Sequence, residues 1–369
     1  MSRTALDDVA LMRRALRLAA RGQGRVEPNP MVGCVIARAG RIIGEGYHRR
    51  FGGPHAEIEA LRRCRSTPRG ASVYVTLEPC CHFGKTPPCT RALVAAEVGR
   101  VVAAMRDPHP LVGGRGLREL RRAGIRVESG LLAREAGELN APYLKLLRRR
   151  RPWVILKWAQ SLDGKIATRS GESKWITDAA CRAHAQRLRG RVDAILVGCN
   201  TVLRDDPMLT CRLAGARRVA TRVVLDTRLR TPLDARLVRS ARRTPTWIVC
   251  GAGASRSRAA ALQAAGCVVH RVPAGRDGLS LPAVLDLLGA RAMTNVLVEG
   301  GGRLLGSFVD QRLADEFHIY VAPLLIGGGR AISALNASGP AALRDALRLG
   351  KRVLVRRLGS GWLLQARAR

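Results

Sequence analysis

Four consecutive arginines followed by a proline, Arg148 to Pro152, interrupt the chain near its middle. A run of like charges repels itself and stays solvated, and the proline closes the pattern that precedes it. Strand and helix patterns are complete on both sides of this run, and 369 residues are too many for one ordinary core. We therefore predict two domains, residues 1–147 and 153–369, joined by a linker at 148–152.

Hydrophobic periodicity predicts that strands and helices alternate in both halves. The first half should contain helices at 7–20, 55–64, 90–97 and 117–123, and strands at 31–37, 41–47, 72–77, 101–105 and 125–128. The second half should contain a helix near 178–189 and strands at 153–158, 194–197, 222–225, 247–250, 268–272, 295–298, 317–321, 352–356 and 361–365. Each half is therefore expected to be an α/β domain in which helices cover a sheet.

The formal charge of +36 normally indicates nucleic acid or another anionic surface as a partner. Here the cations are spread along the whole chain and only 4% of the residues are aromatic, whereas base-stacking surfaces need aromatic rings. A small phosphorylated substrate is the preferred partner, and nucleic acid is not. Because no apolar run reaches the roughly 18 residues of a membrane span, and Met1 to Ala10 lack the layout of a signal peptide, we expect a cytoplasmic protein without a membrane partner.

Two segments of the first half carry the residue types of a zinc-dependent deaminase. His55-Ala56-Glu57 comes first, and Pro79-Cys80 follows a predicted strand. In that signature a histidine and two cysteines bind zinc, water takes the fourth position, and the glutamate moves protons. The usual position of the second cysteine is occupied by Phe83, so the second thiolate must come from Cys89 or Cys81.

Cys89 is the better candidate, because adjacent cysteines rarely bind one tetrahedral ion without strain. The two prolines at 87–88 stiffen the approach to it, and His82 is a candidate fourth ligand. Spacing alone leaves open whether His55 and Glu57 converge, because residues i and i+2 of an ideal helix point about 200° apart.

A glycine-rich segment in the second half indicates a phosphate site. The apolar strand at 295–298 runs into Gly300, Gly301 and Gly302 and then into a helix, so that backbone N–H groups and the positive helix end can face an anion. The segment is not the Gly-x-Gly-x-x-Gly dinucleotide fingerprint, because position 305 is leucine. We therefore expect a nucleotide site outside a Rossmann topology.

The motifs of both halves resemble one family, the bifunctional deaminase/reductases of riboflavin biosynthesis. The segments that carry the resemblance are 28–33 (PNPMVG), 53–57 (GPHAE), 76–89 (TLEPCCHFGKTPPC), 156–165, 171–177, 197–212 and 298–307. Together they extend the similarity over nearly the whole chain. The resemblance implies a cytidine-deaminase-like three-layer α/β/α domain with zinc, followed by a dihydrofolate-reductase-like α/β domain that uses NADPH. A homo-oligomer, either a dimer or a tetramer, is also expected.

For the deaminase half, the resemblance implies that His55, Cys80 and Cys89 bind zinc, that Glu57 is the proton shuttle, and that Asn29 contacts the pyrimidine base. The implied reaction is hydrolytic deamination of 2,5-diamino-6-(5-phosphoribosylamino)pyrimidin-4(3H)-one. NADPH-dependent reduction of the ribosyl group to ribityl then gives 5-amino-6-(5-phosphoribitylamino)uracil.

For the reductase half, the resemblance implies two sets of contacts. Those to NADPH would be made by Ala159, Trp175, Thr201, Asp205, Thr227, Gly301, Gly302, Arg303, Leu304, Leu305, Gly306 and Ser307. Those to the phosphorylated substrate would be made by Ser173, Arg189, Leu209, Arg212 and Glu299. Asp205 is the candidate for assisting proton transfer as hydride reaches the sugar C1′, and Lys157 is the second choice. Two positions depart from the family pattern: His109 replaces an expected asparagine, and Cys81 a common serine.

Two other functions explain part of the sequence. A nucleic-acid or nucleoside deaminase would account for the charge, but the long loop between Cys80 and Cys89 and the reductase segments oppose it. A basic zinc-containing binding protein without catalysis would require Glu57 to be incidental. The bifunctional enzyme is the interpretation that uses all of the motifs.

Overall fold

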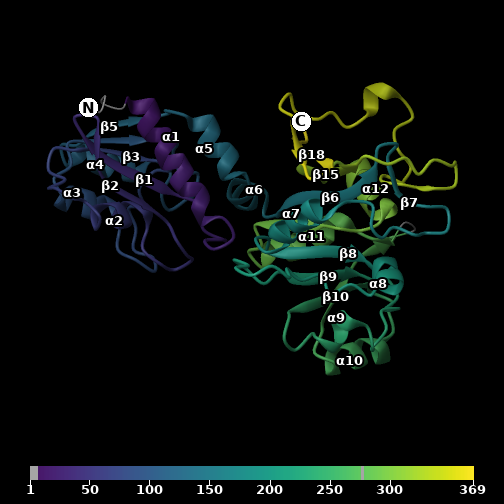
Figure 1. Ribbon diagram of the computed structural model, residues 1–369. Helices are drawn as coiled ribbons and strands as arrows, with labels where there is room; N and C mark the ends of the chain where they lie inside the picture. Colours follow the sequence, from purple (N-terminus) through teal and green to yellow (C-terminus); the bar gives the residue numbers. More distant parts are fainter. Residues whose placement is uncertain (1–6, 276–277) are drawn as a thin grey trace. The chain divides into compact units, whose positions relative to one another are not determined.

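The computed structural model describes residues 7–275 and 278–369 (Figure 1). The chain divides into two compact units, one ending at Arg149 and the other beginning at Arg150. Residues 1–6, which belong to the first predicted domain, lie outside the described residues. In the part of the chain that is described, no helix is long and apolar enough to cross a membrane.

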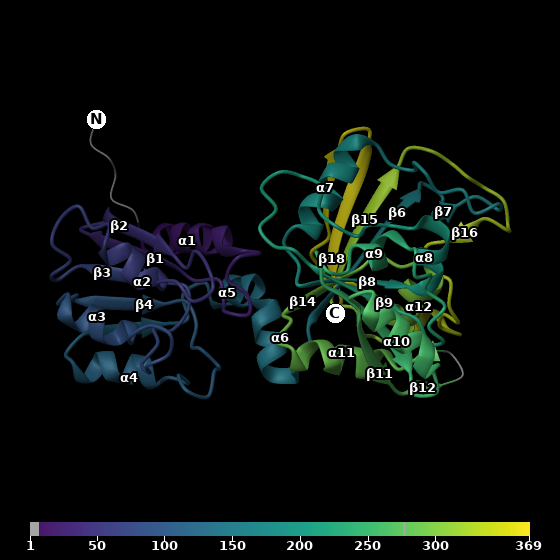
Figure 2. The same ribbon diagram turned by 90° about the horizontal axis from the view of Figure 1, so that it is seen from below.

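Unit 1 is a five-stranded sheet with helices on both faces (Figure 2). The strand order is β2-β1-β3-β4-β5, in which β1 pairs antiparallel with β2 and β3 and the other neighbours are parallel. Helices α2, α3 and α4 pack on one face, and α1 and α5 on the other, which confirms the predicted three-layer α/β/α domain. The elements are α1 (Asp8–Ala19), η1 (Ala20–Gly22), β1 (Gly33–Arg38), β2 (Arg41–Tyr47), α2 (Ala56–Leu61), β3 (Ser72–Val75), α3 (Cys89–Ala95), β4 (Arg100–Ala103), α4 (Arg115–Arg122), β5 (Arg126–Ser129), α5 (Ala133–Leu139) and α6 (Ala141–Arg149).

The helices of unit 1 differ in how clearly their sequences predict them. The side chain of Asp7 caps α1 by accepting a hydrogen bond from the backbone N–H of Ala10, and the helix buries Leu11, Met12 and other apolar residues along one face. Helices α5 and α6 are not predicted from the sequence. Each of these helices has a single buried residue, Ala136 and Leu144 respectively, so the apolar period that signals a helix is weak there.

Unit 2 is a nine-stranded sheet in the order β11-β10-β9-β8-β14-β6-β15-β18-β17. The first seven strands of that order, from β11 at the edge to β15, are parallel to one another. Strand β18 pairs antiparallel with β15, and β17 pairs antiparallel with β18. Helices α11 and α12 pack on one face, and α8, α9 and α10 on the other. The elements are β6 (Trp153–Ser161), β7 (Lys165–Ala167), α7 (Ala179–Arg189), β8 (Ala194–Gly198), α8 (Cys199–Asp205), β9 (Thr221–Leu225), α9 (Arg236–Arg239), β10 (Thr246–Gly251), α10 (Arg256–Ala264), β11 (Val268–Val272), β12 (Ala274–Gly275), β13 (Gly278–Leu279), α11 (Leu281–Ala290), β14 (Asn295–Val298), α12 (Gly302–Asp310), β15 (Glu316–Ala322), β16 (Ile332–Ser333), η2 (Leu343–Asp345), β17 (Leu354–Leu358) and β18 (Gly361–Arg367).

The middle of this sheet brings distant segments together. Strands β8, β14 and β6 are parallel neighbours, so the residues that follow them meet at one edge of the sheet. The chain continues from β8 to β9 on one side and from β14 to β15 on the other. Such a switch of direction is where open α/β sheets bind ligands, beyond the carboxyl ends of their strands.

The arginine run at 148–152 is partly built into secondary structure. Arg148 and Arg149 end α6, where cations interact favourably with the negative end of the helix dipole. Arg151 donates two hydrogen bonds to Asp286 of α11, at 2.6 and 3.0 Å. The backbone of Arg150 packs against Gly289 so closely that a side chain at 289 would collide with it. The last residues of the run are therefore attached to unit 2.

Candidate metal centre and nucleotide site

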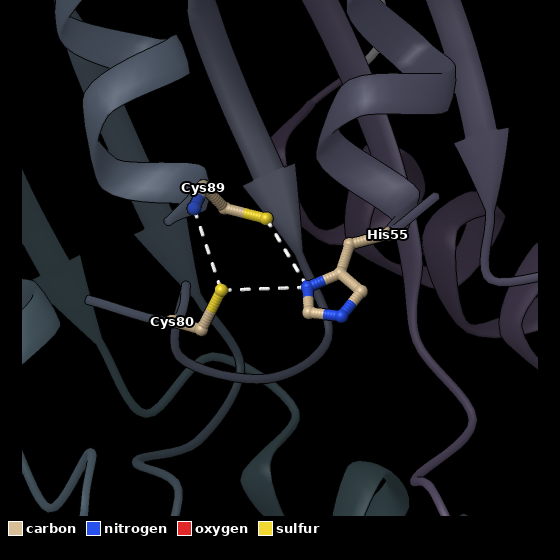
Figure 3. Close-up of side chains that lie close together, drawn as sticks. All are labelled: His55, Cys80 and Cys89. Carbon is tan, nitrogen blue, oxygen red and sulfur yellow. Dashed lines mark hydrogen bonds between the residues drawn. The ribbon is translucent and has the colours of Figure 1, made fainter. Parts of the chain in front are cut away.

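Three side chains of unit 1 point toward one another (Figure 3). The Nδ1 atom of His55 lies 3.4 Å from the Sγ atom of Cys80 and 3.3 Å from that of Cys89. All three ligand atoms lie within 4.8 Å of one another, and Cys89 is fully buried. Nitrogen and sulfur ligands of a tetrahedral zinc ion are about 3.5 Å apart, so these positions fit zinc.

Each of the three residues lies at the start of an element or in a loop. His55 precedes α2 with an extended backbone (φ −73°, ψ 165°), and Cys89 is the first residue of α3. Cys80 lies in the loop between β3 and α3. Because His55 is outside the helix, the angle of about 200° between positions i and i+2 of an ideal helix does not separate it from Glu57.

The electrostatics of the cluster suit a cation. The Cys89 side chain, and after it His55, stabilise the thiolate of Cys80 and lower its pKa. The interaction with Cys80, together with burial, raises the pKa of the Cys89 thiol. The backbone N–H of Cys89 also donates to the Cys80 sulfur, at 3.3 Å. A thiolate, a second thiol and an imidazole nitrogen form the kind of donor set that zinc prefers.

The two alternative ligands considered from the sequence lie outside this cluster. The thiol of Cys81 donates to the carbonyl oxygen of Leu111 at 3.8 Å. The ring of His82 stacks near that of His109, with centroids 6.2 Å apart. Among the described residues, only His55, Cys80 and Cys89 bring three such ligand atoms together.

Glu57 lies beside the cluster, on the first turn of α2. The residue is 3% exposed, and burial raises the pKa of its carboxyl to about 7. Its carboxyl and the thiol of Cys89 interact, because each affects the pKa of the other. A buried carboxyl that titrates near neutral pH can both accept and donate a proton, as a general acid–base catalyst must.

Asn29 is positioned by a histidine that the sequence analysis missed. The Nδ1 atom of His48 lies 3.0 Å from the carbonyl oxygen of Pro54, which can only accept a hydrogen bond. Nδ1 therefore carries the proton, and Nε2 accepts from Nδ2 of Asn29 at 3.3 Å. This orientation leaves the Asn29 side-chain oxygen available to accept from a ligand. His48 also contacts His55 edge to face, with centroids 5.4 Å apart.

In unit 2, a buried ionic cluster lies between β6, α7 and the residue after β14. Arg189 donates two hydrogen bonds to Glu299, at 2.9 and 2.5 Å, and the Nζ atom of Lys157 lies 3.8 Å from the same carboxylate. Burial disfavours the charge on Glu299, but Arg189 and Lys157 outweigh it and hold the pKa at about 2. Burial lowers the pKa of Lys157. The bidentate face of Arg189 is thus occupied by Glu299.

The glycines after β14 form an open helix start. Gly301 precedes α12 with an extended backbone, and no side chain caps this helix. A Cβ atom added to Gly301 would meet nothing within 4 Å, whereas one added to Gly302 would collide with the backbone oxygen of Ser333. Free N–H groups facing open space at the start of a nine-residue helix suit a phosphate.

Comparisons with known proteins assign a family domain to each half of the chain. Residues 152–362 match the RibD C-terminal domain, and residues 6–105 match the cytidine and deoxycytidylate deaminase zinc-binding region. The riboflavin biosynthesis protein RibD of Bacillus amyloliquefaciens is 44% identical over 90% of this chain and 89% of its own length. The chain belongs to the RibD family.

Solved structures support this assignment. RibD of Acinetobacter baumannii has a TM-score of 0.86 at 37% identity, over 98% of this chain and 99% of that chain. A diaminohydroxyphosphoribosylaminopyrimidine deaminase/5-amino-6-(5-phosphoribosylamino)uracil reductase from Thermotoga maritima has a TM-score of 0.84 at 35% identity, with the same coverage. As a RibD family member, the chain is a bifunctional deaminase and reductase of riboflavin biosynthesis. Its cofactors are zinc in the first domain and NADPH in the second.

The predicted reductase residues of this RibD chain lie on several elements. Those on the elements at the switch point are Lys157, Ala159, Thr201, Asp205, Glu299 and residues 301–307. Asp205 is exposed at the end of α8, and within the described ranges no hydrogen bond or ion pair joins it to Glu299. Trp175 is 67% exposed with Arg182 4.7 Å from its ring centroid, and Thr227 follows β9. Among the described residues, no hydrogen bond joins Ser173 to Lys157, Arg189 or Glu299.

Two buried charges that sequence reasoning missed hold loops in place. Glu78 accepts backbone hydrogen bonds from Asp107, Gly114 and Leu117, at 3.2, 2.9 and 3.2 Å, and so fixes the loop that carries His109. Glu78 is part of the motif at 76–89, but nothing in the sequence names its partners, which are 29 to 39 positions away.

Arg222, which is fully buried, donates to the carbonyl oxygen of Met208 at 3.3 Å. The next residue, Leu209, is buried with a left-handed backbone (φ 49°). The backbone N–H of Arg212 donates to Gln186 of α7, one turn before Arg189. This anchors the loop that contains two of the predicted substrate contacts.

Proposed function

We propose that this chain deaminates 2,5-diamino-6-(5-phosphoribosylamino)pyrimidin-4(3H)-one and then reduces the ribosyl group of the product, giving 5-amino-6-(5-phosphoribitylamino)uracil. The observation that carries the proposal is the convergence of His55, Cys80 and Cys89 beside the buried Glu57, in a chain that also has the reductase domain of the RibD family. The name of the similar Thermotoga maritima protein supports the same two substrates.

In the deaminase step, His55, Cys80 and Cys89 would hold zinc. Zinc, when bound, supplies a water molecule of lowered pKa. Glu57 would take a proton from that water as its oxygen bonds to the amino-bearing carbon, and would give it to the amino group, so that the C–N bond breaks and ammonia leaves. The Asn29 oxygen would accept a hydrogen bond from the pyrimidine and orient it.

In the reductase step, NADPH supplies a hydride to the sugar C1′. The proposed nucleotide contacts are Ala159, Trp175, Thr201, Asp205, Thr227 and Gly301 to Ser307. The proposed substrate contacts are Ser173, Arg189, Leu209, Arg212 and Glu299. For Arg189, a phosphate would have to compete with the carboxylate of Glu299 that it binds in the structure.

The proton that accompanies the hydride has two candidate donors. Asp205 is exposed, and Lys157 is buried beside Glu299 with a lowered pKa, which makes its ammonium a stronger acid. The two candidates can be distinguished with the variants Asp205→Asn and Lys157→Met, by following the oxidation of NADPH in the presence of the deaminated substrate. We expect Asp205→Asn to lower kcat more, and the reverse result would assign the role to Lys157.

The complete proposal is tested with purified protein, the pyrimidine precursor and NADPH. Ammonia release and loss of reduced-nicotinamide absorbance should occur one for one. Ammonia release from cytidine or an oligonucleotide, without release from the precursor, would favour a nucleic-acid or nucleoside deaminase.

We also propose that the chain works in the cytoplasm as a homo-oligomer, either a dimer or a tetramer. Strand β17 ends the nine-stranded sheet, and the apolar side chains of Leu354 and Val355 on it are 51% and 57% exposed. A second copy could cover this apolar edge symmetrically. Sedimentation of the full chain and of the Val355→Glu variant measures the oligomeric state. A wild-type chain that sediments as a monomer would contradict the proposal.

The domain boundaries are likewise a proposal: residues 1–147, a linker at 148–152, and 153–369. Fragments beginning at residue 150 and at residue 153 can be compared. Both should fold and bind NADPH without zinc, and the longer one should be more stable because it keeps the pair between Arg151 and Asp286. A soluble, folded fragment that binds no nicotinamide nucleotide would contradict the proposal.

A further inference from the structure

A hollow lies along the outer edge of β2, and none of the residues assigned to either reaction lines it. Strand β2 ends the sheet of unit 1, so no strand pairs with its outer side. The hollow has a volume of about 470 Å³ and is lined by β2 together with residues of α1 and of the segment after α2. Residues that face opposite sides of the strand line it, Glu45 on the α1 side and Gly44 on the α2 side. It therefore lies over the edge of the sheet.

The backbone of β2 offers unpaired groups to this hollow. The N–H of His48 donates to the carbonyl oxygen of Val32 on the β1 side, and the register pairs Gly46 with Cys34 two residues earlier. Hydrogen-bonded pairs alternate along an antiparallel ladder, so the N–H and C=O groups of Glu45 and Tyr47 face outward. Among the described residues no hydrogen bond to these four groups is found.

Near the start of β2 the same edge is already used. The N–H of Arg65 donates to the carbonyl oxygen of Ile43 at 2.9 Å. This bond shows that the outer side of β2 can accept a backbone partner. It also limits the open edge to the stretch from Glu45 to Tyr47.

The walls of the hollow are strongly cationic. Five arginines line it: Arg14, Arg21, Arg49, Arg63 and Arg65. Two carboxylates offset them in part, because Arg14 pairs with Glu45 at 2.6 Å while Arg49 and Arg63 pair with Glu59 at 3.1 and 2.5 Å. Five cations against two anions leave a net charge of about +3 around an open strand edge, a field that attracts anions.

The charge also decides what can occupy the edge. In a twofold dimer the same patch would meet itself, and the five arginines of one copy would face those of the other. The chain itself has no segment with acidic residues at three alternate positions, so it offers no acidic strand to fill the hollow. The occupant must combine negative charge with an extended backbone that has both donors and acceptors.

We propose that this edge binds an acidic segment of another polypeptide, which adds as a short sixth strand beside Glu45 and Tyr47. The main chain of the segment pairs with the outward N–H and C=O groups, and alternate acidic side chains reach the arginines on the two sides. Strand addition of this kind takes affinity from the backbone and specificity from the side chains. This assignment does not depend on the residue roles proposed for the two reactions.

Fluorescence anisotropy of a labelled peptide with alternating glutamate and threonine, titrated with the full zinc-loaded chain, tests the proposal. Arg21→Glu with Arg65→Glu should weaken binding by about tenfold or more, because two cations of the hollow are reversed. Arg118→Glu with Arg122→Glu is the matched control. Both of its positions are exposed on α4, which packs on β5 at the opposite end of the sheet, and the net charge changes equally.

The backbone contribution is tested on the peptide. Methylation of every second backbone nitrogen of the peptide removes hydrogen-bond donors without changing the charge. Two such peptides can be made, one for each alternate set of nitrogens, and the one whose methylated nitrogens face β2 should bind about tenfold more weakly. Hydrogen exchange gives a readout that needs no variant, since the amides of Glu45 and Tyr47 should become protected when the peptide binds.

Three results would overturn the proposal. One is equal loss of binding in both double variants, with polyphosphate competing as well as peptide, which would show a general polyanion effect. Another is binding that is unchanged for both methylated peptides. The third is absence of binding combined with self-association of the Arg21 and Arg65 double variant, which would mean that the arginines only protect the edge from pairing with other copies.

Discussion

The metal centre of unit 1 and the ionic cluster of unit 2 are both sets of three side chains, but they are assembled over different sequence distances. His55 and Cys89 are 34 positions apart, whereas Arg189 and Glu299 are 110 apart. The first set is presented by a loop and by residues at the starts of two helices. The second is held by strands β6 and β14 and by α7, inside the packed layers. Loss of a residue should therefore affect chemistry in unit 1, and both stability and chemistry in unit 2.

The largest effect is expected at Cys89. Cys89→Ser should remove most of the zinc and with it the deaminase activity, because two ligands cannot replace a three-ligand site. Cys81→Ser is the matched control, since its thiol faces Leu111 and not the cluster. Metal analysis of both proteins measures the difference. A Cys81→Ser protein without zinc, beside a Cys89→Ser protein with it, would reverse the ligand assignment.

Glu57 separates metal binding from catalysis. Glu57→Gln should keep about one zinc per chain but lose deamination by about 10²- to 10⁴-fold, because an amide cannot carry a proton between water and the leaving amine. Reduction of the already deaminated substrate by the same protein should be unchanged. Ammonia release at the wild-type rate would remove Glu57 from this role.

The contrast between the two sites also explains what the sequence could predict. The residues at 55, 57, 80 and 89 belong to two short motifs, so their chemistry is legible without knowing the fold. His48 and Glu78 act through partners that no local pattern names, such as Pro54 for His48 and the backbone of Leu117 for Glu78. The pairing of Arg189 with Glu299 depends on the order of the strands, and 58 arginines in the sequence give no sign of which one is buried.

In unit 1, helix prediction failed where burial is slight. The strands of both sheets are mostly apolar and were found from their periodicity, although their ends differ by a few residues. Helices α5 and α6 escaped because each buries only one residue, and the arginine run appeared solvated because the pairing of Arg151 with Asp286 joins positions 135 apart.

Breaking the ionic cluster tests the claim that unit 2 combines stability with chemistry. Glu299→Gln leaves the charges of Arg189 and Lys157 buried without an anion, which should lower the free energy of unfolding by about 3–5 kcal/mol. Asp286→Asn breaks an exposed pair with Arg151 and should cost only about 0–1 kcal/mol. All five tryptophans lie in unit 2, at 153, 158, 175, 247 and 362, so tryptophan fluorescence follows its unfolding in the full chain. Equal losses in the two variants would show that the cluster is not a stability element.

The pH dependence gives an independent measure of the same cluster. The pKa of Glu299 is about 2 in the folded chain, below its ordinary value of 4.5. The carboxylate therefore contributes stability above about pH 4.5, and this contribution is lost as the pH falls toward 2. Wild-type stability should decline across this interval more steeply than that of Glu299→Gln. Parallel profiles would mean that Glu299 titrates normally.

The smallest effect is expected at Gly301, where the comparison is sharpest because function can be changed without disturbing the fold. An added side chain enters open space there, so Gly301→Ala and Gly301→Val should unfold at the wild-type temperature. Both should nevertheless weaken NADPH binding, alanine slightly and valine by about tenfold, because the side chain keeps a phosphate from the first N–H groups of α12. The KM for the deaminated substrate should change less than that for NADPH. Gly302→Ala should instead lose stability, since its Cβ would collide with the backbone of Ser333. If Gly301→Val binds NADPH normally, the phosphate lies elsewhere along the switch point, and the sites of unit 2 must be assigned again from a bound complex.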